Sequence, residues 1–295
     1  MNLEEVFLSS CRTDYNISKN TRETYLGCVK RFSAFLEERH VQIEDINIRV
    51  LIDFFATLPY SVSLKRLMIA ALRKLGNTLV LNNIIPKNIF LKLGLPRRVK
   101  RIPKVFTVEE VDRFLDIIDT STLVGIRDRA MFELIYSAGL KASEAANAEL
   151  KALYLKECFL LVTGNGDKQR MVLFGDVCRR KLTEYLEYSR PFLTNNRNSG
   201  YIFMTTQGTK MTRNEIWYRF EKYREKVGLE GSVNTLRHSF ATHLVKNGMD
   251  LKSVSELLGH SNLTTTSIYT HLDKDYLREV HHKYFPAGAL EEDSD

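Results

Sequence analysis

The sequence is poor in the features that build disulfide frameworks, metal sites and membrane spans. Its 4 cysteines, among 295 residues, lie far apart at Cys11, Cys28, Cys158 and Cys178, without the paired spacing of zinc sites. We therefore expect no metal or other cofactor, and reduced, mostly buried thiols. No apolar run approaches the roughly 20 residues that a membrane helix needs. The N-terminal Met-Asn-Leu-Glu-Glu-Val does not resemble a secretion signal, so we expect a cytoplasmic protein with no membrane partner.

Length and composition favour a soluble globular protein of one large or two ordinary domains. Hydrophobic residues make up 44% of the chain and charged residues 27%. The formal net charge of +7 favours a polyanionic partner such as nucleic acid. Many basic proteins bind no nucleic acid, however, so charge alone does not decide the function.

The first 95 residues are predicted to be helical. In segment 18–36, apolar residues recur at helical spacing, and segments 47–58 and 61–81 repeat this pattern. Basic side chains lie along the third segment, and Lys65 and Arg73 are candidate DNA contacts there.

A basic, proline-flanked segment follows at residues 96–106. Pro96 and Pro103 disfavour helix on either side. Five cations lie between or just after them: Arg97, Arg98, Lys100, Arg101 and Lys104. The segment is either a solvated linker or a linker that crosses a phosphate backbone, and we take Arg97, Arg98, Lys100 and Arg101 as candidate DNA contacts.

A second domain is predicted from residue 107, where Thr-Val-Glu-Glu forms a capping box. The β-prone runs 159–163 and 170–174 flank a glycine-containing turn and predict a hairpin. Helical patterns then cover 177–188, 213–227, 235–247, 251–258 and 264–272. The expected fold is mainly α with a small β-hairpin. Its boundaries are 1–95 for the N-terminal domain, 96–106 for the linker, 107–286 for the second domain and 287–295 for an acidic, disordered tail.

Two motifs carry most of the functional information. One contains Leu-Arg-His-Ser-Phe-Ala-Thr-His-Leu around Arg237. The other contains Leu-Leu-Gly-His-Ser-Asn-Leu and Tyr-Thr, with His260 and Tyr269. This spacing would let helices and short turns gather an arginine, a histidine and a tyrosine around one phosphate. The chain resembles the tyrosine recombinases, the phage-integrase and Xer-type enzymes, over nearly its whole length.

The resemblance implies a helical core-binding domain and a catalytic domain that form a clamp on double-stranded DNA. It implies Tyr269 as the nucleophile, with Arg237 and His260 binding the phosphate. A phosphotyrosine linkage conserves the bond energy, so that neither metal nor nucleotide is needed. His238 and His243 match the family pattern as structural neighbours. The implied assembly is a tetramer on two DNA sites, made of this chain alone or with a paralogous recombinase.

Three positions depart from the family's catalytic pattern. Lys141 replaces an arginine and keeps the charge but not the planar fork. Asn165 replaces the hairpin lysine that acts as the general acid, and Lys168 lies three residues further along as a candidate substitute or a solvated turn residue. Asn234 replaces a histidine and cannot take up a proton as imidazole does.

Three hypotheses follow from this pattern. The first is a site-specific recombinase that cuts and rejoins DNA, with weakened catalysis. The second is a catalytically degenerate DNA-binding relative that acts architecturally or as the partner of an active recombinase. The third, a type IB topoisomerase-like nicking enzyme, fits the domain order less well. The motifs leave open the DNA target sequence and the role in dimer resolution, integration, inversion or chromosome partition.

Overall fold

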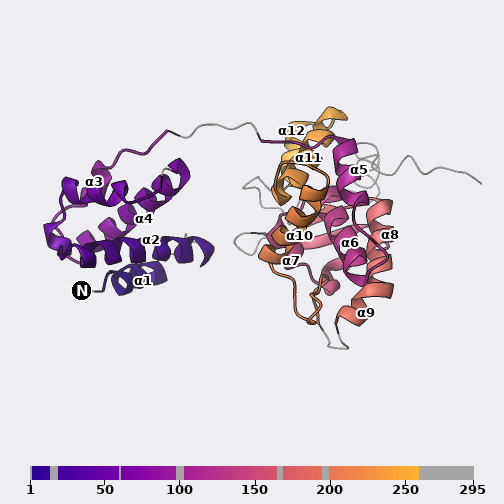
Figure 1. Ribbon diagram of the computed structural model, residues 1–295, viewed down its shortest axis with the longest axis horizontal. Coiled ribbons are helices and arrows are strands. Elements are labelled where there is room, and N and C mark those ends of the chain that lie inside the picture. The colour runs from indigo at the N-terminus through magenta and orange to yellow at the C-terminus, as the bar shows by residue number, and fades with distance from the viewer. Residues whose placement is uncertain are drawn as a thin grey trace, which may run out of the picture. The chain divides into compact units, whose positions relative to one another are not determined.

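The computed structural model describes residues 2–13, 19–59, 61–97, 103–164, 169–194 and 199–258 (Figure 1). The chain divides into two compact units, Met1–Arg101 and Ile102–Asp295. Both units are mainly helical, and a small sheet lies in the second, as the sequence predicts. None of the described helices has the length and apolarity required to span a bilayer.

The first unit is a helical bundle around a phenylalanine-rich core. Its helices are α1 (Leu3–Thr13), α2 (Lys19–Glu38), α3 (Ile48–Ala56) and α4 (Val62–Leu81), with short 3-10 turns at Ile43–Asp45 and Ile89–Lys92. Phe32 and Phe54 meet edge to face with ring centroids 4.9 Å apart, and Phe90 packs on Phe32 from the last turn. These rings are almost fully buried, so the apolar periodicity of the sequence does mark the core.

Two arginines of α4 hold the end of the first unit. Arg73 donates from Nη2 to the carbonyl oxygen of Leu93 at 2.7 Å, and Arg66 donates from Nη1 to that of Pro96. The amide of Asn88 donates to the carbonyl oxygen of Arg73 at 2.9 Å. These bonds fasten the segment before the basic linker to the side of α4.

The second unit places helices around a three-stranded antiparallel sheet of order β1-β2-β3. The strands are β1 (Leu153–Tyr154), β2 (Phe159–Thr163) and β3 (Gln169–Leu173). The helices are α5 (Val108–Asp116), α6 (Leu123–Ser137), α7 (Ala142–Ala146), α8 (Asp176–Glu184), α9 (Arg190–Leu193), α10 (Arg213–Lys226), α11 (Val233–Lys246) and α12 (Leu251–Leu257), with a 3-10 turn at Leu150–Ala152 and a π-turn at Tyr185–Ser189. Helix α6 packs against α5, α7, α8 and α11 and supplies much of the core (Figure 1).

Several local predictions are confirmed. The Thr107 hydroxyl accepts the Glu110 N–H while the Glu110 carboxylate accepts the Thr107 N–H, which is the predicted capping box. The predicted hairpin is β2 paired with β3, with Thr163 opposite Gln169. Cys28, Cys158 and Cys178 are buried, and none of these three forms a disulfide. The predicted helix 264–272 and the acidic tail lie outside the described residues.

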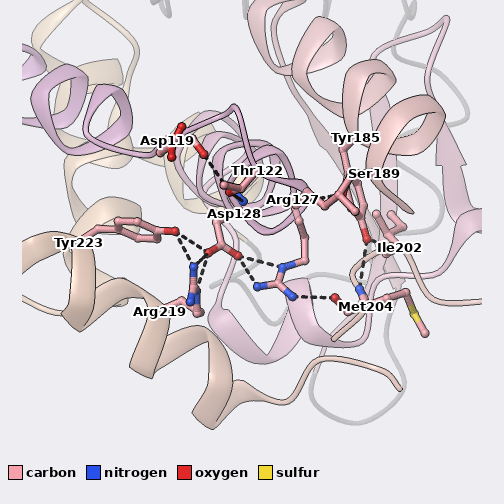
Figure 2. Close-up of polar contacts among 12 residues, drawn as sticks. Asp119, Thr122, Arg127, Asp128, Tyr185, Ser189, Ile202, Met204, Arg219 and Tyr223 are labelled. Carbon is pink, nitrogen blue, oxygen red and sulfur yellow. Dashed lines mark hydrogen bonds and ion pairs between the residues drawn. The ribbon is translucent and has the colours of Figure 1, made fainter. Parts of the chain in front are cut away.

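A fully buried carboxylate organises the polar core of the second unit, as Figure 2 shows. Asp128 accepts hydrogen bonds from Arg127 Nε at 2.9 Å and Nη2 at 2.7 Å, and from the Tyr223 hydroxyl at 2.8 Å. Arg219 of α10 reaches the second oxygen of the same carboxylate. Arg127 donates further to the carbonyl oxygen of Met204 at 2.9 Å. The network ties α6 to α10 and to the segment that precedes α10.

We expect Asp128→Ala to destabilise the second unit by about 3–5 kcal/mol, because Arg127 would stay buried without its carboxylate. The free energy of unfolding from urea titrations would measure the loss. Asp116→Ala is the matched control, since Asp116 is an exposed carboxylate paired with Arg129 at 2.8 Å and should change stability little. Equal effects of the two variants would contradict a structural role for the buried network.

Candidate active site

The turn between α6 and α7 brings two predicted regions together. Gly139 has φ of +58°, and a Cβ there would lie 2.6 Å from a ring carbon of Phe240 and 2.9 Å from a methyl carbon of Leu258. Only glycine fits this left-handed, closely packed position. The turn therefore runs directly against α11 and the end of α12 before Lys141 begins α7.

Glu144, in the first turn of α7, is the carboxylate of the site. Arg170 of β3 binds it with a bidentate fork, Nη1 to Oε1 at 2.7 Å and Nη2 to Oε2 at 2.9 Å. The main-chain N–H of Lys141 donates to Oε2 at 2.8 Å. Burial acts to raise the pKa of Glu144, but the Arg170 fork, the Lys141 N–H and the charge of Arg237 together hold the pKa below its usual value. The carboxylate is therefore ionised at neutral pH.

Arg237 lies on α11 with its guanidinium buried. Nη2 donates to the carbonyl oxygen of Leu258 at 2.6 Å, and Nη1 donates to that of Gly139. Nη1 also lies 3.7 Å from Oε2 of Glu144, which is ion-pair distance but not a hydrogen bond. Burial lowers the pKa of Arg237 to about 10; the nearby Arg170 guanidinium adds to the lowering, and Glu144 opposes it. The charged form is thus penalised unless more negative charge approaches.

Lys141 completes a group of four charged side chains that we call the Glu144 cluster: Lys141, Glu144, Arg170 and Arg237. The Lys141 side chain is 40% exposed, and its Nζ lies 4.0 Å from Oε1 of Glu144. Three cations thus face one carboxylate, and Arg170 already satisfies that carboxylate. The cluster has an excess of positive charge, partly buried, which favours binding of an anion such as phosphate.

Only some of the other predicted site residues lie in the part of the chain that the structure describes. Asn234 is exposed in the first turn of α11, one turn before Arg237. Lys65 and Arg73 are half-buried on α4, and Arg97 is exposed at the end of the first unit. The structure does not describe the other predicted positions: Tyr269, His260, Asn165, Lys168, Arg98, Lys100 and Arg101.

His243, on the same helix as Arg237, is a buried structural residue. Its Nε2 lies 3.0 Å from the carbonyl oxygen of Phe106, which can only accept, so Nε2 carries the proton. Its Nδ1 accepts from the hydroxyl of Tyr136 at 2.9 Å. The N–H of Phe106 donates to Ser239 Oγ at 2.8 Å. Helix α11 therefore binds both main-chain polar groups of Phe106, the last residue of the predicted linker.

Sequence reasoning missed Glu144 and Arg170 as site residues. A signal for Arg170 exists in the strand pattern, because β2 and β3 present Leu160, Val162 and Val172 inward, and Arg170 occupies the same face. A charged residue on a buried strand face requires a buried partner. The partner is 26 positions earlier in the chain, so spacing alone does not identify it.

The chain matches two families along its length. Residues 104–275 match the phage integrase family, and residues 5–82 match the phage integrase N-terminal SAM-like domain.

Curated relatives align over almost the whole chain. A tyrosine recombinase XerD from Lacticaseibacillus casei is 35% identical over 289 residues, 96% of this chain and 98% of that protein. A tyrosine recombinase XerD from Pseudomonas aeruginosa is 32% identical over 287 residues, 96% of each chain.

Solved structures have the same fold. The XerH site-specific recombinase bound to palindromic difH substrate, in a post-cleavage complex, aligns with TM-score 0.68 at 25% identity over 95% of this chain and 84% of that one. A lambda integrase dimer bound to a COC′ core site aligns with TM-score 0.70 over 92% of this chain and 96% of that one, at 15% identity. The lambda integrase likeness concerns the fold alone.

The environment of His243 predicts an acid-dependent loss of stability. Burial lowers its pKa, and Lys246 adds to this, while the Phe106 carbonyl and Glu109 oppose it. The folded pKa of His243 lies below the unfolded value of about 6.5. The stability that neutral His243 contributes is therefore complete above that pH and is lost as the pH falls toward the folded pKa.

The test compares urea midpoints at pH 7.5 and 5.5. We expect the urea midpoint to fall less between pH 7.5 and 5.5 in His243→Gln than in the wild type, since glutamine cannot acquire charge. His238→Gln, an exposed imidazole on the same helix, is the control. A fall of unchanged size in His243→Gln would show that His243 does not cause the acid dependence.

Proposed function

This chain belongs to the phage integrase family of tyrosine recombinases, and from that premise we propose that it is a site-specific recombinase that breaks and rejoins double-stranded DNA. The observation that carries the proposal is the excess positive charge of the Glu144 cluster. Arg237 within it donates to the carbonyl oxygens of Gly139 and Leu258, and its Nη1 lies 3.7 Å from Oε2 of Glu144. Such a guanidinium is suited to fork onto a phosphodiester.

In the proposed reaction the Tyr269 hydroxyl attacks the phosphorus and the bond to the 5′ oxygen breaks. The product is a 3′-phosphotyrosyl intermediate and a free 5′-hydroxyl, and a second 5′-hydroxyl reverses the step on a new strand. Arg237, Lys141 and His260 bind the non-bridging oxygens as negative charge develops. The chemistry needs no cofactor, since the tyrosine ester retains the bond energy.

The altered positions are expected to slow this reaction. Lys141 supplies one charge without the guanidinium fork, and Asn234 can hydrogen-bond but not transfer a proton. Asn165 cannot protonate the leaving oxygen, and Lys168 is the candidate substitute. Losing one oriented donor costs about 10²–10³ in rate, and losing a general acid about 10²–10⁴. These losses need not multiply, because residues that act as a unit are not additive.

A second candidate function follows from the same positions. In it, the chain binds a recombination site but cuts poorly, and acts architecturally or beside an active paralogous recombinase. The exposed amide of Asn234, on the helix that carries Arg237, favours this candidate because it cannot take up a proton. In either case we propose assembly on DNA, as a tetramer spanning two sites or as a mixed complex.

Covalent capture on DNA separates the two candidates. The protein would be incubated with nicked suicide duplexes that carry sites selected by its own binding. A recombinase should give a denaturation-resistant protein–DNA adduct that is absent in Tyr269→Phe. Tight binding without an adduct in the wild type would contradict the first function and support the second.

A restored variant extends this experiment. Lys141→Arg, Asn165→Lys and Asn234→His combined should raise the single-turnover cleavage rate by about 10² or more, since an oriented donor and a general acid return. The same variant with Tyr269→Phe is the control. If the restored variant still leaves the duplex uncut, the site is not disabled at those three positions alone.

The basic linker is proposed to contact phosphate, together with Lys65 and Arg73 of α4. Replacing Arg97, Arg98, Lys100 and Arg101 by alanine should weaken DNA binding and flatten the plot of log affinity against log salt. Each lost phosphate contact should reduce the slope by about 0.9. The measurement is fluorescence anisotropy of a labelled duplex over a series of salt concentrations.

Arg179→Ala is the control for this slope, because Arg179 is a cation of α8 already paired with Asp176 at 3.0 Å. An unchanged slope in the linker variant, or an equal change in Arg179→Ala, would exclude a specific linker contact. Arg73→Ala tests a different effect. Its guanidinium bonds the Leu93 carbonyl, so it can weaken binding by loosening the segment that leads into the linker.

A further inference from the structure

We propose that Arg170 is a positioning residue that occupies the Glu144 carboxylate and so prevents Glu144 from competing with a phosphate for Arg237 and Lys141. This inference rests on the proposed function, because it names a new residue for the same site. Arg170 would not touch the phosphate in this role. It acts through Glu144, by competing with the two phosphate-binding cations for one carboxylate.

The competition is visible in the distances around Glu144. Arg170 makes two hydrogen bonds to the carboxylate, at 2.7 and 2.9 Å. Arg237 and Lys141 stand at 3.7 and 4.0 Å from its oxygens, at ion-pair distance without hydrogen bonds to it. All three cations are attracted to the same group, and the bidentate fork gives Arg170 the strongest hold.

Removal of Arg170 would leave Glu144 in need of a new partner. Glu144 is 5% exposed, and an unpaired carboxylate at that burial is strongly unfavourable. The nearest cation is Arg237, less than 1 Å beyond hydrogen-bond length. A Glu144 carboxylate without Arg170 would therefore draw the Arg237 guanidinium into direct hydrogen bonds and neutralise the charge that the phosphate requires.

Arg170 makes a second contact that suits an arginine at this position. Its Nε lies 3.4 Å from the carbonyl oxygen of Leu257, while Arg237 donates to that of Leu258. The two guanidiniums thus bind consecutive carbonyl groups at the end of α12. A lysine could not occupy both carboxylate oxygens and a carbonyl with fixed geometry. Arg170 thereby connects β3 and α7 to the end of α12.

A double-mutant cycle tests the competition directly. The variants are Arg170→Met, Glu144→Gln and the two combined, in the full chain. The probe is inorganic phosphate, titrated calorimetrically at a temperature where every variant has the circular dichroism spectrum of the wild type. Arg237→Gln defines the phosphate binding that belongs to this site. Arg170→Lys is added as a variant that keeps charge but loses the fork.

Arg170→Met should weaken phosphate binding by about tenfold, the effect of losing a charge-assisted hydrogen bond. The combined variant should recover most of this loss, because Glu144→Gln removes the competing charge. Arg170→Lys should fall between the wild type and Arg170→Met. If Arg170 had only a structural role, Arg170→Met would lower the unfolding midpoint, and the combined variant would not recover phosphate affinity.

Three results would overturn the proposal: wild-type affinity in Arg170→Met, no recovery in the combined variant, or no phosphate binding that depends on Arg237. The titration does not require DNA cleavage, so its result is independent of the covalent capture by Tyr269. If capture fails while the cycle shows recovery, the recombinase activity is wrong but the role of Arg170 holds. If capture succeeds and recovery is absent, the recombinase activity holds but the role proposed for Arg170 is wrong.

Discussion

The buried Glu144 carboxylate is the constraint on which the candidate site depends. It joins the start of α7, the strand β3 and the helix α11, which come from distant parts of the sequence. A buried carboxylate must be compensated, and Arg170 compensates it almost completely. The positions of Arg237 and Lys141 are then set by other bonds, to main-chain carbonyls and to the α7 terminus. Three cations thus surround one carboxylate, and the cluster carries an excess of positive charge.

Two of the buried acids of the second unit, Asp128 and Glu144, have different surroundings. Asp128 accepts hydrogen bonds from two arginines and a tyrosine hydroxyl, and these partners lie on α6 and α10. Arg219 in that network is partly exposed, so solvent partly screens its charge. Arg237 is almost fully buried and lies 3.7 Å from the carboxylate of Glu144. Similar residue types therefore connect helices in one place and form the proposed anion-binding site in the other.

Sequence reasoning recovered what local patterns encode. The capping box at Thr107, the β2–β3 hairpin and the helix that carries Arg237 follow from spacing within a few residues. The two-residue strand β1 and the π-turn at Tyr185–Ser189 have no comparable periodic signal. The Glu144–Arg170 pair could not be derived, because it depends on how the fold brings α7 and β3 together. The family resemblance indicated roles for Arg237 and Lys141, but gave no role to Glu144.

The attachment of Phe106 to α11 has a mechanical consequence. Ser239 binds its N–H and His243 its carbonyl oxygen, and Tyr136 supports His243 from α6. A tensile load on the chain just after the linker would pass into α11 at these two side chains. Helix α5 begins only at Val108, after the attachment, and would carry little of that load. A load on the linker would thus act first on the helix that carries Arg237.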